Sequence, residues 1–355
     1  MLQHPKQNTN IYELLPEVSI KMTHISYANA INQKKTLIII GAGRKIKVFE
    51  IPYINGQPGQ LKEIQKLKEH SNDVVSLKFF NLPQLNDSFI SGSSMVDNSI
   101  IIWSKLPKQD GSICYGLQQR LKGHVDSVTN LLIHPIREDI IISGSQDTTI
   151  KFWSKDHQWA CQQTIKDFSR PIKDLAINYE GNKLVSCSDE KFFLIMEPDQ
   201  QSQWIVKQKI KFPQEIIRIC FITNDILTVL QNKGTQLHFF IQNQHQHFTK
   251  SLDHLKIAEP GDSCFGLFPP CYSSNTDTLL IKNGNKVNIV KFKFPISKEG
   301  VKKMDSQGDW TCKLEQVIEF NDNFLFGSMS QDGEYIVLWD INSFNIQIRK
   351  YINQQ

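Results

Sequence analysis

Four side chains in the middle of the sequence have types that could act together chemically: His124, Ser143, Asp147 and Trp153. Aspartate, histidine and serine are the components of a hydrolytic triad, in which histidine takes the proton of a serine nucleophile. Ser143, however, follows a run of isoleucines, and neither a nucleophile elbow nor an oxyanion-hole pattern accompanies it. The alternative is a structural network in which each polar group hydrogen-bonds to the next, so that all can be buried. The pattern favours this structural role over catalysis.

Three short apolar runs must position these side chains. Val128, Leu131 and Ile133 mark the first run, Ile140 to Ile142 form the second, and the third ends at Trp153. Polar and turn-forming residues separate the runs. Short strands of period two between such turns predict an antiparallel meander.

The stretch from Gly123 to Trp153 resembles a WD40 repeat. That family pattern has Gly-His at its start, Ser-Gly-Ser-x-Asp at its second turn and Trp-Asp at its end, where this chain has Ser154. The resemblance implies that Asp147 accepts a hydrogen bond from His124, and that the imidazole and the Trp153 indole both meet the Ser143 hydroxyl. Further positions that match the repeat pattern are His70, Asp97, Trp103, Asp189, Asp332 and Trp339.

One such repeat cannot bury both faces of its small sheet, so further repeats are expected. The same rhythm recurs with apolar or aromatic residues at the end of each unit. These closing positions are Phe49, Trp103, Trp153, Met196, Phe240, Phe292 and Trp339. Their spacing of about 40–55 residues matches a four-stranded propeller blade. The sequence therefore predicts an all-β chain that forms a single seven-bladed WD40-type propeller of antiparallel blades.

The expected domain organisation is an N-terminal extension over residues 1–17 and a propeller over 18–355. The segment 345–352 follows the last closing position and has no further blade to join. We expect it to close the ring as the outer strand of the first blade, against residues near Val48, because closure leaves only short and protected edges.

No cofactor and no metal ion are expected. Gly41 to Arg44 contain two glycines, but no third glycine or Lys-Ser/Thr follows, so a hairpin turn is favoured over a phosphate loop. His245 and His247 alternate near His254 without a carboxylate or cysteine that would complete a metal site.

The seven cysteines are scattered without CxxC spacing, which indicates a reducing compartment. We expect the cytoplasm, with the nucleus and the cilium as alternatives.

Propellers that resemble this one act as rigid platforms, and partners dock around the central channel. Carried onto this chain, the resemblance places a partner-binding face at Asp73, Val75, Ser127, Thr129, Gln146, Arg170, Lys173, Ser188 and Gln331. Arg170 and Lys173 are the candidates to pair with an acidic group. The net charge is +4, and the lysine-rich stretches fall on different blades and alternate with acids. Nucleic acid is therefore not expected as a direct ligand.

Three functional classes remain open, because a fold does not specify a function. The favoured class is a non-enzymatic scaffold or adaptor whose partners are proteins or peptides in a multiprotein complex. The second is a substrate receptor that recognises a peptide or modified peptide at the channel. The third is an enzyme, for which no convergent carboxylates, histidines or metal ligands are found. No stretch approaches the ~20 apolar residues of a membrane span, so membrane insertion is not expected.

Overall fold

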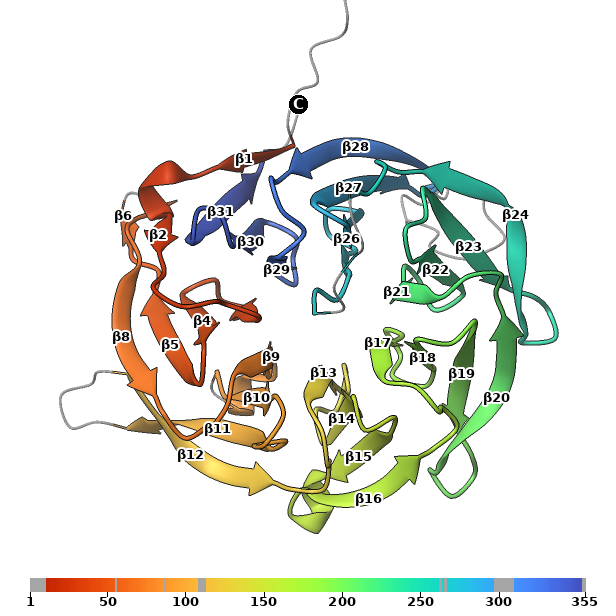
Figure 1. Ribbon diagram of the computed structural model, residues 1–355, viewed down its shortest axis with the longest axis horizontal. Helices are drawn as coiled ribbons and strands as arrows, with labels where there is room; N and C mark the ends of the chain where they lie inside the picture. Colours follow the sequence, from red (N-terminus) through yellow and green to blue (C-terminus); the bar gives the residue numbers. More distant parts are fainter. Residues whose placement is uncertain are drawn as a thin grey trace, which may run out of the picture.

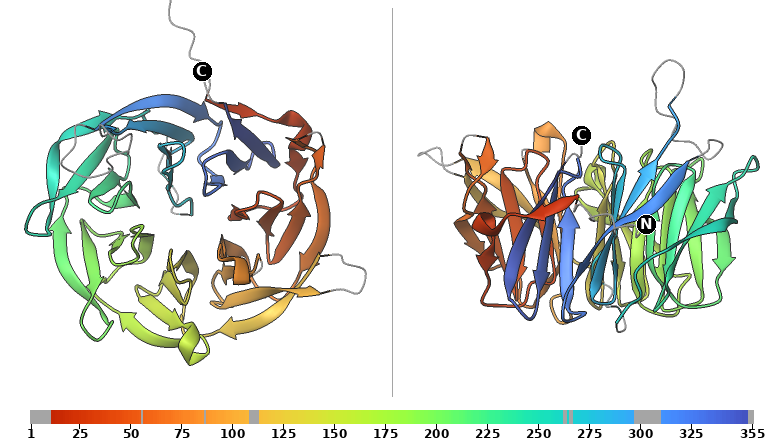
Figure 2. Two further views of the ribbon diagram at one scale, coloured as in Figure 1. Left: turned by 180° about the vertical axis from the view of Figure 1, so that it is seen from behind. Right: turned by 90° about the horizontal axis from the view of Figure 1, so that it is seen from above.

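Seven small antiparallel sheets are arranged as a ring around a common axis (Figure 1). The computed structural model describes residues 11–54, 56–85, 87–107, 113–261, 264, 267–296 and 310–352. Seen edge-on, the strands run between the two faces of the ring (Figure 2). The prediction of an all-β, seven-bladed propeller with four-stranded blades is confirmed.

The blades are numbered in chain order, and their strands are given from the axis outward. Blade 1 contains β3 (Asn29–Ile31), β4 (Leu37–Ala42), β5 (Lys45–Glu50) and β8 (Lys62–Leu67). Blade 2 contains β9 (Val74–Phe79), β10 (Phe89–Ser93), β11 (Ile100–Pro107) and β12 (Ile113–Leu121). Blade 3 contains β13 (Val128–Ile133), β14 (Ile140–Ser145), β15 (Ile150–Ser154) and β16 (Ala160–Ile165). Blade 4 contains β17 (Ile172–Ile177), β18 (Leu184–Ser188), β19 (Phe192–Pro198) and β20 (Trp204–Lys211).

The remaining blades follow the same plan. Blade 5 contains β21 (Ile216–Phe221), β22 (Ile226–Gln231), β23 (Gln236–Gln242) and β24 (Phe248–Lys256). Blade 6 contains β25 (Cys271–Ser273), β26 (Thr278–Asn283), β27 (Lys286–Lys293) and β28 (Thr311–Glu319). Blade 7 contains β29 (Leu325–Met329), β30 (Tyr335–Asp340), β31 (Asn345–Tyr351) and β1 (Tyr12–Leu14), and β2 (Ile20–Lys21) also pairs with β31.

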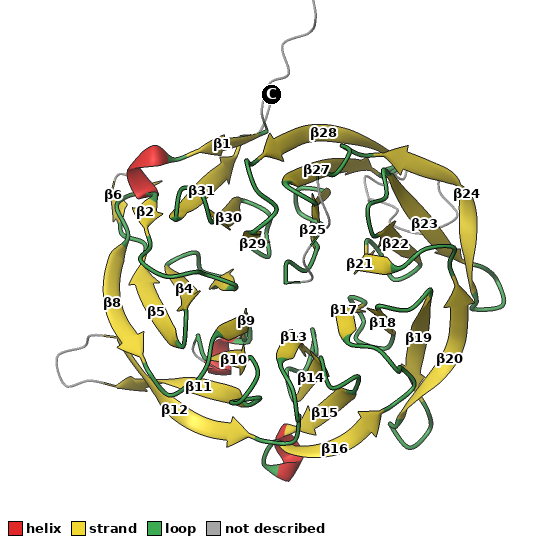
Figure 3. Ribbon diagram, in the orientation of Figure 1, coloured by secondary structure: helices red, strands yellow, loops and turns green. Residues whose placement is uncertain are grey.

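Helical structure is minor (Figure 3). In the described part of the chain it consists of short 3-10 segments at Pro16–Val18, Pro83–Leu85 and Lys155–His157, and a small hairpin joins β6 (Tyr53–Ile54) to β7 (Gln57–Pro58). Within that part, no helix has the length and apolar character needed to cross a membrane.

Burial follows from the position of each strand in its blade. The second strands β4 and β26 are buried at every residue, because neighbouring blades cover both faces of their sheets. The outer strand β20 instead alternates, with Trp204 buried and Ile205 exposed, because its outward face meets solvent. This difference explains why second strands such as β4 (LIIIGA) have apolar residues at successive positions.

The ring is closed by its N-terminal strand, so the predicted closure is wrong. Tyr12 pairs with Tyr351, and Ile20 pairs with Ile346, which makes residues 345–351 the third strand of blade 7. The strand that pairs with Val48 at the outer edge of blade 1 is β8, through Gln65. The predicted boundary at residue 17 is also wrong, because β1 belongs to the propeller.

The sequence of blade 7 explains why the ring closure was predicted wrongly. Residues 324–332 (FLFGSMSQD) mimic the second strand and turn of a repeat, but β29 is the innermost strand of its sheet. Trp339 therefore lies on the second strand, whereas the other six closing residues all lie on third strands. Its ring stacks on Phe326 at 6.0 Å between centroids, and its buried indole nitrogen has no hydrogen-bond partner among the described residues.

Glutamines on the outer strands connect successive blades. Gln65 donates to the Tyr115 carbonyl (2.7 Å) and accepts from the Tyr115 N–H (2.6 Å). The same paired contact joins Gln163 to Trp204, Gln208 to Phe248 and Gln316 to Tyr12. Each glutamine satisfies backbone groups that an edge strand would otherwise leave open. These glutamines share a sequence motif, Gln-x-Leu/Ile-Lys/Glu, which also occurs at Gln119. A search for apolar periodicity does not detect this motif, so the contacts were not predicted.

Candidate functional site

One face of the ring carries the loops that lead into the innermost strands and the turns between second and third strands. In blades 2 to 4 these are residues 68–73, 122–127 and 166–171, and residues 94–99, 146–149 and 189–191. We call this surface the tetrad face. The opposite face carries the turns between first and second strands, such as residues 134–139 and 330–334.

In blade 3 a buried chain of hydrogen bonds holds the tetrad face in place. Asp147 Oδ2 lies 2.7 Å from His124 Nδ1, and Ser143 Oγ lies 2.7 Å from His124 Nε2. The Trp153 indole N–H donates to the same Ser143 oxygen over 2.9 Å. Because a carboxylate only accepts hydrogen bonds, Nδ1 carries the proton and Nε2 accepts from the serine hydroxyl. Ser143 is thus fully engaged and buried, without access for a substrate.

The electrostatics of this network fix the charge on its aspartate. Burial alone would raise the pKa of Asp147, but the hydrogen bonds from His124 and Thr149 outweigh it and hold the pKa well below its usual range. The Val125 backbone N–H also donates to this carboxylate, over 3.0 Å. An ionised Asp147 therefore ties the loop before β13 to the turn after β14.

Blade 2 contains a second network of the same geometry. His70 lies 2.8 Å from Asp97 and 2.7 Å from Ser91, and Trp103 donates to Ser91 over 2.8 Å. The longer turn before Asp97 does not disturb these contacts. Arg120 from the outer strand adds an ion pair to Asp97 at 3.2 Å. The blades with complete tetrads are therefore neighbours.

Blade 4 keeps only fragments of the network. Phe168 stands where the other two blades have histidine, and Met196 stands where they have tryptophan. Glu190 accepts from the Ser169 N–H over 3.1 Å, which is the role of the turn aspartate, whereas Asp189 pairs with Lys173 at 2.9 Å. The residue equivalent to Ser143 is Ser186, whose buried hydroxyl has no hydrogen-bond partner in the part of the chain that the structure describes.

The structure separates the predicted partner-binding residues into groups. Gln146 and Arg170 are exposed on the tetrad face, and Asp73, Thr129 and Lys173 are half-buried there. Val75, Ser127 and Ser188 are buried, so the expectation that they are exposed is wrong. Their strands or loops are packed against a neighbouring blade or turn. For example, the Ser127 hydroxyl accepts from the Met95 N–H of blade 2 over 2.9 Å.

Gln331 and Asp332 lie on the opposite face. They occupy the turn between the first and second strands of blade 7, and Asp332 pairs with Lys35 of blade 1 at 2.7 Å. The position of Gln331 is therefore not equivalent to that of Gln146, for the same reason that Trp339 is not equivalent to Trp153.

An exposed apolar group on the tetrad face was not identified from the sequence. Met95, Val96 and Val125 are 64%, 87% and 81% exposed, respectively. Met95 belongs to the turn after β10, and its backbone is bonded to Ser127, two residues from Val125. Single exposed apolar residues are ordinary, whereas a group on one face marks an interaction surface. The only available signal was three apolar residues inside otherwise polar loops.

The tetrad face presents a charged side chain that can bind a partner. Arg170 is exposed and forms no hydrogen bond or ion pair with another described residue. The described residues contain no group of three or more His, Cys, Asp or Glu side chains able to hold a metal ion. The tetrad residues His70, Asp97, His124 and Asp147 are engaged in their own networks.

Comparison with known proteins supports the repeat pattern in this region. A family model described as "WD domain, G-beta repeat" matches residues 61–104 and 116–154. Each match covers the outer strand of one blade and the first three strands of the next. These matches contain the two complete tetrads.

Similar proteins carry the same repeats at low identity. Pre-mRNA-processing factor 19 of Bos taurus is 23% identical over 160 residues, which cover 44% of this chain and 30% of the relative. Protein transport protein sec13 of Aspergillus fumigatus is 34% identical over 134 residues, covering 36% and 40%. Pre-mRNA-processing factor 17 of Homo sapiens is 21% identical over 146 residues, covering 40% and 22%. The matched region therefore spans less than half the length of each of these relatives.

Proposed function

We propose that this chain, a seven-bladed β-propeller that carries WD40 repeats, is a non-catalytic scaffold or adaptor that binds other proteins within a larger complex. The relatives are named for pre-mRNA processing and for protein transport. These two processes differ, so the shared feature that we carry over is the repeat platform and not a particular pathway. We also propose that the chain acts in the cytoplasm.

The observation that carries the proposal is the exposed apolar group Met95, Val96 and Val125. These side chains project from short loops whose backbones are fixed by the two tetrads, because the Ser71 and Val125 N–H groups donate to Asp97 and Asp147. A rigid apolar surface loses little conformational entropy when a partner binds. Such a surface suits a protein partner with a complementary apolar patch.

A second candidate function is recognition of an acidic peptide at the same face. The exposed Arg170 supports it, because its guanidinium has no partner among the described residues and can pair with a carboxylate or phosphate. Lys173 is less suited than the sequence suggested, since it is already paired with Asp189.

Affinity purification from native extract tests the proposal. The tagged wild-type chain is compared with the double variant Val96→Glu/Val125→Glu, which places two charges in the apolar group. The matched control is Leu252→Glu, since Leu252 is 98% exposed on the outer strand of blade 5. We expect stoichiometric partners with the wild type and the control, and their loss from the double variant. Partners retained by all three proteins would place the interface elsewhere, and an absence of partners would contradict the scaffold role.

A further inference from the structure

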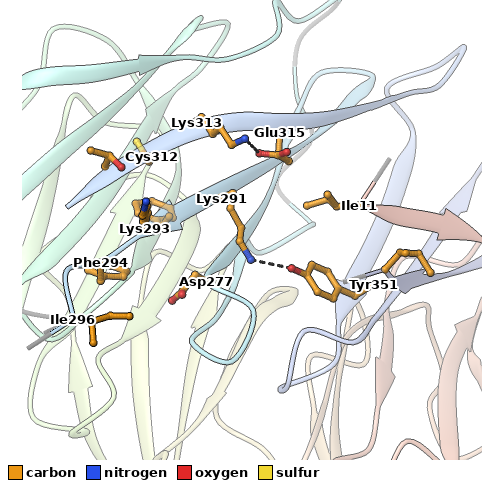
Figure 4. Close-up of a pocket in the computed structure, with 13 residues that line it drawn as sticks. Ile11, Asp277, Lys291, Lys293, Phe294, Ile296, Cys312, Lys313, Glu315 and Tyr351 are labelled. Carbon is orange, nitrogen blue, oxygen red and sulfur yellow. Dashed lines mark hydrogen bonds and ion pairs between the residues drawn. The ribbon is translucent and has the colours of Figure 1, made fainter. Parts of the chain in front are cut away.

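A cavity of about 730 Å³ lies at the outer rim between blades 6 and 7, toward the opposite face (Figure 4). Its walls come from β27 and β28 of blade 6, from the end of β31 and from the residue that precedes β1. It is remote from the tetrad face, and neither the tetrads nor the proposed docking group involves it.

Three lysines gather on one sheet face at this cavity. Lys291 and Lys313 are direct cross-strand partners, and Lys293 is opposite Thr311 one pair further along. Side chains two residues apart on a strand share a face, so Lys291, Lys293 and the cross-strand neighbour Lys313 leave the sheet on the same side. Like charges directly opposite each other are destabilising. The fold therefore maintains an unfavourable concentration of positive charge at this site.

The three lysines differ in their contacts with the described residues. Lys313 pairs with Glu315 at 2.7 Å, and Lys291 donates to the Tyr351 hydroxyl over 2.9 Å and to the Thr276 carbonyl, which are neutral acceptors. The other acid, Asp277, accepts from the Tyr272 hydroxyl. Lys293 is exposed and forms no hydrogen bond or ion pair with another residue that the structure describes.

Apolar side chains lie beside these lysines. Phe294 and Ile11 are buried at the cavity wall, and Ile296 and Ile352 are 70% and 36% exposed at its rim. Figure 4 shows Ile296 and Phe294 below Lys293, with Lys291 directed toward Tyr351 on the neighbouring blade. The cavity thus offers a cation without a described partner next to an apolar wall, and its size falls within the range of about 300–1,000 Å³ for ligand sites.

We propose that this cavity binds a segment of a partner protein in which an Asp or Glu side chain lies within two residues of a large apolar side chain. The carboxylate pairs with Lys293, and the apolar side chain covers Ile296. A carboxylate fits better than a phosphate, because the described lining contains no arginine to form the paired contacts that phosphate recognition favours. A protein segment fits better than a nucleic acid, because Phe292 and Phe294 are buried and offer no ring face for base stacking.

Fluorescence polarisation with defined peptide pools tests this proposal. The probe is a pool of labelled peptides with both termini blocked, each with one Asp or Glu within two residues of Phe or Leu. A matched pool carries Asn or Gln at the acidic position. The full chain is compared with Lys293→Glu and with Lys207→Glu, which makes the same charge change at an exposed site on β20.

We expect the acidic pool to bind the wild type and the Lys207→Glu control equally. Replacement of the acid by its amide, or of Lys293 by Glu, removes a charge-assisted contact and should weaken binding about tenfold. A third pool with Lys at the acidic position should bind the Lys293→Glu chain better than it binds the wild type. That charge exchange distinguishes direct pairing from a general effect on folding.

Several results would overturn the proposal. Equal binding of the acidic and amide pools would remove the role of the carboxylate, and equal effects of the Lys293 and Lys207 substitutions would place the site elsewhere. Displacement of the pool by inorganic phosphate or by an oligonucleotide would indicate another ligand class, and absence of binding to the wild type would reject the site. None of these results depends on the tetrad face.

Discussion

Blades 2 and 3 each contain a complete tetrad, whereas blades 4 to 6 lack one and carry buried charged side chains on their inner strands that bond to the next blade. In blades 2 and 3, each of Ser91 and Ser143 donates to a histidine and accepts from a tryptophan of its own blade. In blade 4 the equivalent Ser186 hydroxyl has no partner among the residues that the structure describes. The same four-stranded sheet is therefore compatible with two different ways of satisfying its polar groups.

The blades without tetrads are linked along the inner side of the ring. Asp174 of blade 4 accepts from the Ile219 N–H of blade 5 over 2.9 Å, and Arg218 of blade 5 donates to Cys264 before blade 6. Lys282 of blade 6 donates to the Asn323 carbonyl before blade 7 over 2.7 Å. All three charged side chains belong to fully buried residues. A buried carboxylate also joins the tetrad blades, because Glu138 of blade 3 accepts from the Asn81 and Leu82 N–H groups of blade 2. Damage at Asp174, Arg218 or Lys282, where no tetrad supports the blade, should spread across a blade junction.

The largest effect is expected from Asp174→Leu. This change removes the acceptor for the Ile219 N–H and, above about pH 7 where Asp174 is ionised, the negative charge that acts on the buried Arg218, so the comparison is made at pH 8. Removal of one partner from a buried charged pair costs about 3–5 kcal/mol, and urea denaturation measures the loss of unfolding free energy. Asp174→Asn retains a side-chain oxygen and should cost about 1 kcal/mol. Equal losses in the two variants would show that packing, and not charge, governs this junction.

The same residue gives a pH dependence opposite to that of the tetrads. Burial raises the pKa of Asp174 to about 7, although Arg218 and two backbone N–H groups act against the shift. The folded state then holds a proton that the unfolded state, with a pKa of about 3.9, has released. This group therefore makes the unfolding free energy fall as pH rises from about 4 to about 7, by an amount on the order of 3 kcal/mol.

Denaturation across pH 5 to 8, in wild type and Asp174→Asn, measures this contribution. The variant has no titrating carboxyl, so its unfolding free energy should change less over the range. Asp147 contributes in the other direction: its depressed pKa stabilises the fold above about pH 4 and loses this effect as pH falls further. Parallel pH profiles for the two proteins would contradict the assignment to Asp174.

A matched pair of serine variants compares the two kinds of blade directly. Ser143→Ala removes the oxygen that joins His124 to Trp153, leaving both buried groups unsatisfied, at a cost of about 1–3 kcal/mol. Ser186→Ala removes a buried hydroxyl that bonds to no described residue, so we expect no loss or a small gain in unfolding free energy. The same substitution at equivalent positions controls for strand propensity. Similar losses of unfolding free energy in Ser143→Ala and Ser186→Ala would contradict the difference between blade 3 and blade 4.

The sequence was sufficient to predict the six blades whose second turn and third strand follow the repeat order. It also identified the residues of the blade 3 tetrad, because their types and spacing are unusual within apolar strands. The closure was mispredicted because Phe326 to Asp332 copies the local chemistry of a repeat turn, and only strand pairing reveals that β29 is innermost. Asp174, Arg218 and Lys282 were missed because a charged residue between apolar ones predicts a solvent-facing position.

The smallest change in unfolding free energy is expected at the glutamine contacts, which occur both in a blade with a tetrad and in a blade without one. Gln163 in blade 3 and Gln208 in blade 4 each bond the next outer strand, while Asp253 has the corresponding position in blade 5. Asp253 is exposed beside Leu252, and its strand departs from regular pairing between His238 and Phe240. The junction between blades 5 and 6 thus lacks the paired glutamine contact within the described residues.

Gln163→Ala removes two hydrogen bonds at a partly solvent-accessible edge, so the unfolding free energy should fall by only about 1 kcal/mol. The Trp204 N–H, which donates to the Gln163 oxygen over 2.9 Å, should exchange its hydrogen faster in the variant, while the tetrad strands of blade 3 remain protected. In the wild type, amides at the start of β28 should exchange faster than those at the start of β20, because no glutamine holds that edge among the described residues. Equal exchange rates at the two edges would show that the glutamine contacts do not stabilise the outer strands. Faster exchange at β28 would instead show that the junction between blades 5 and 6 is less protected than the junction between blades 3 and 4.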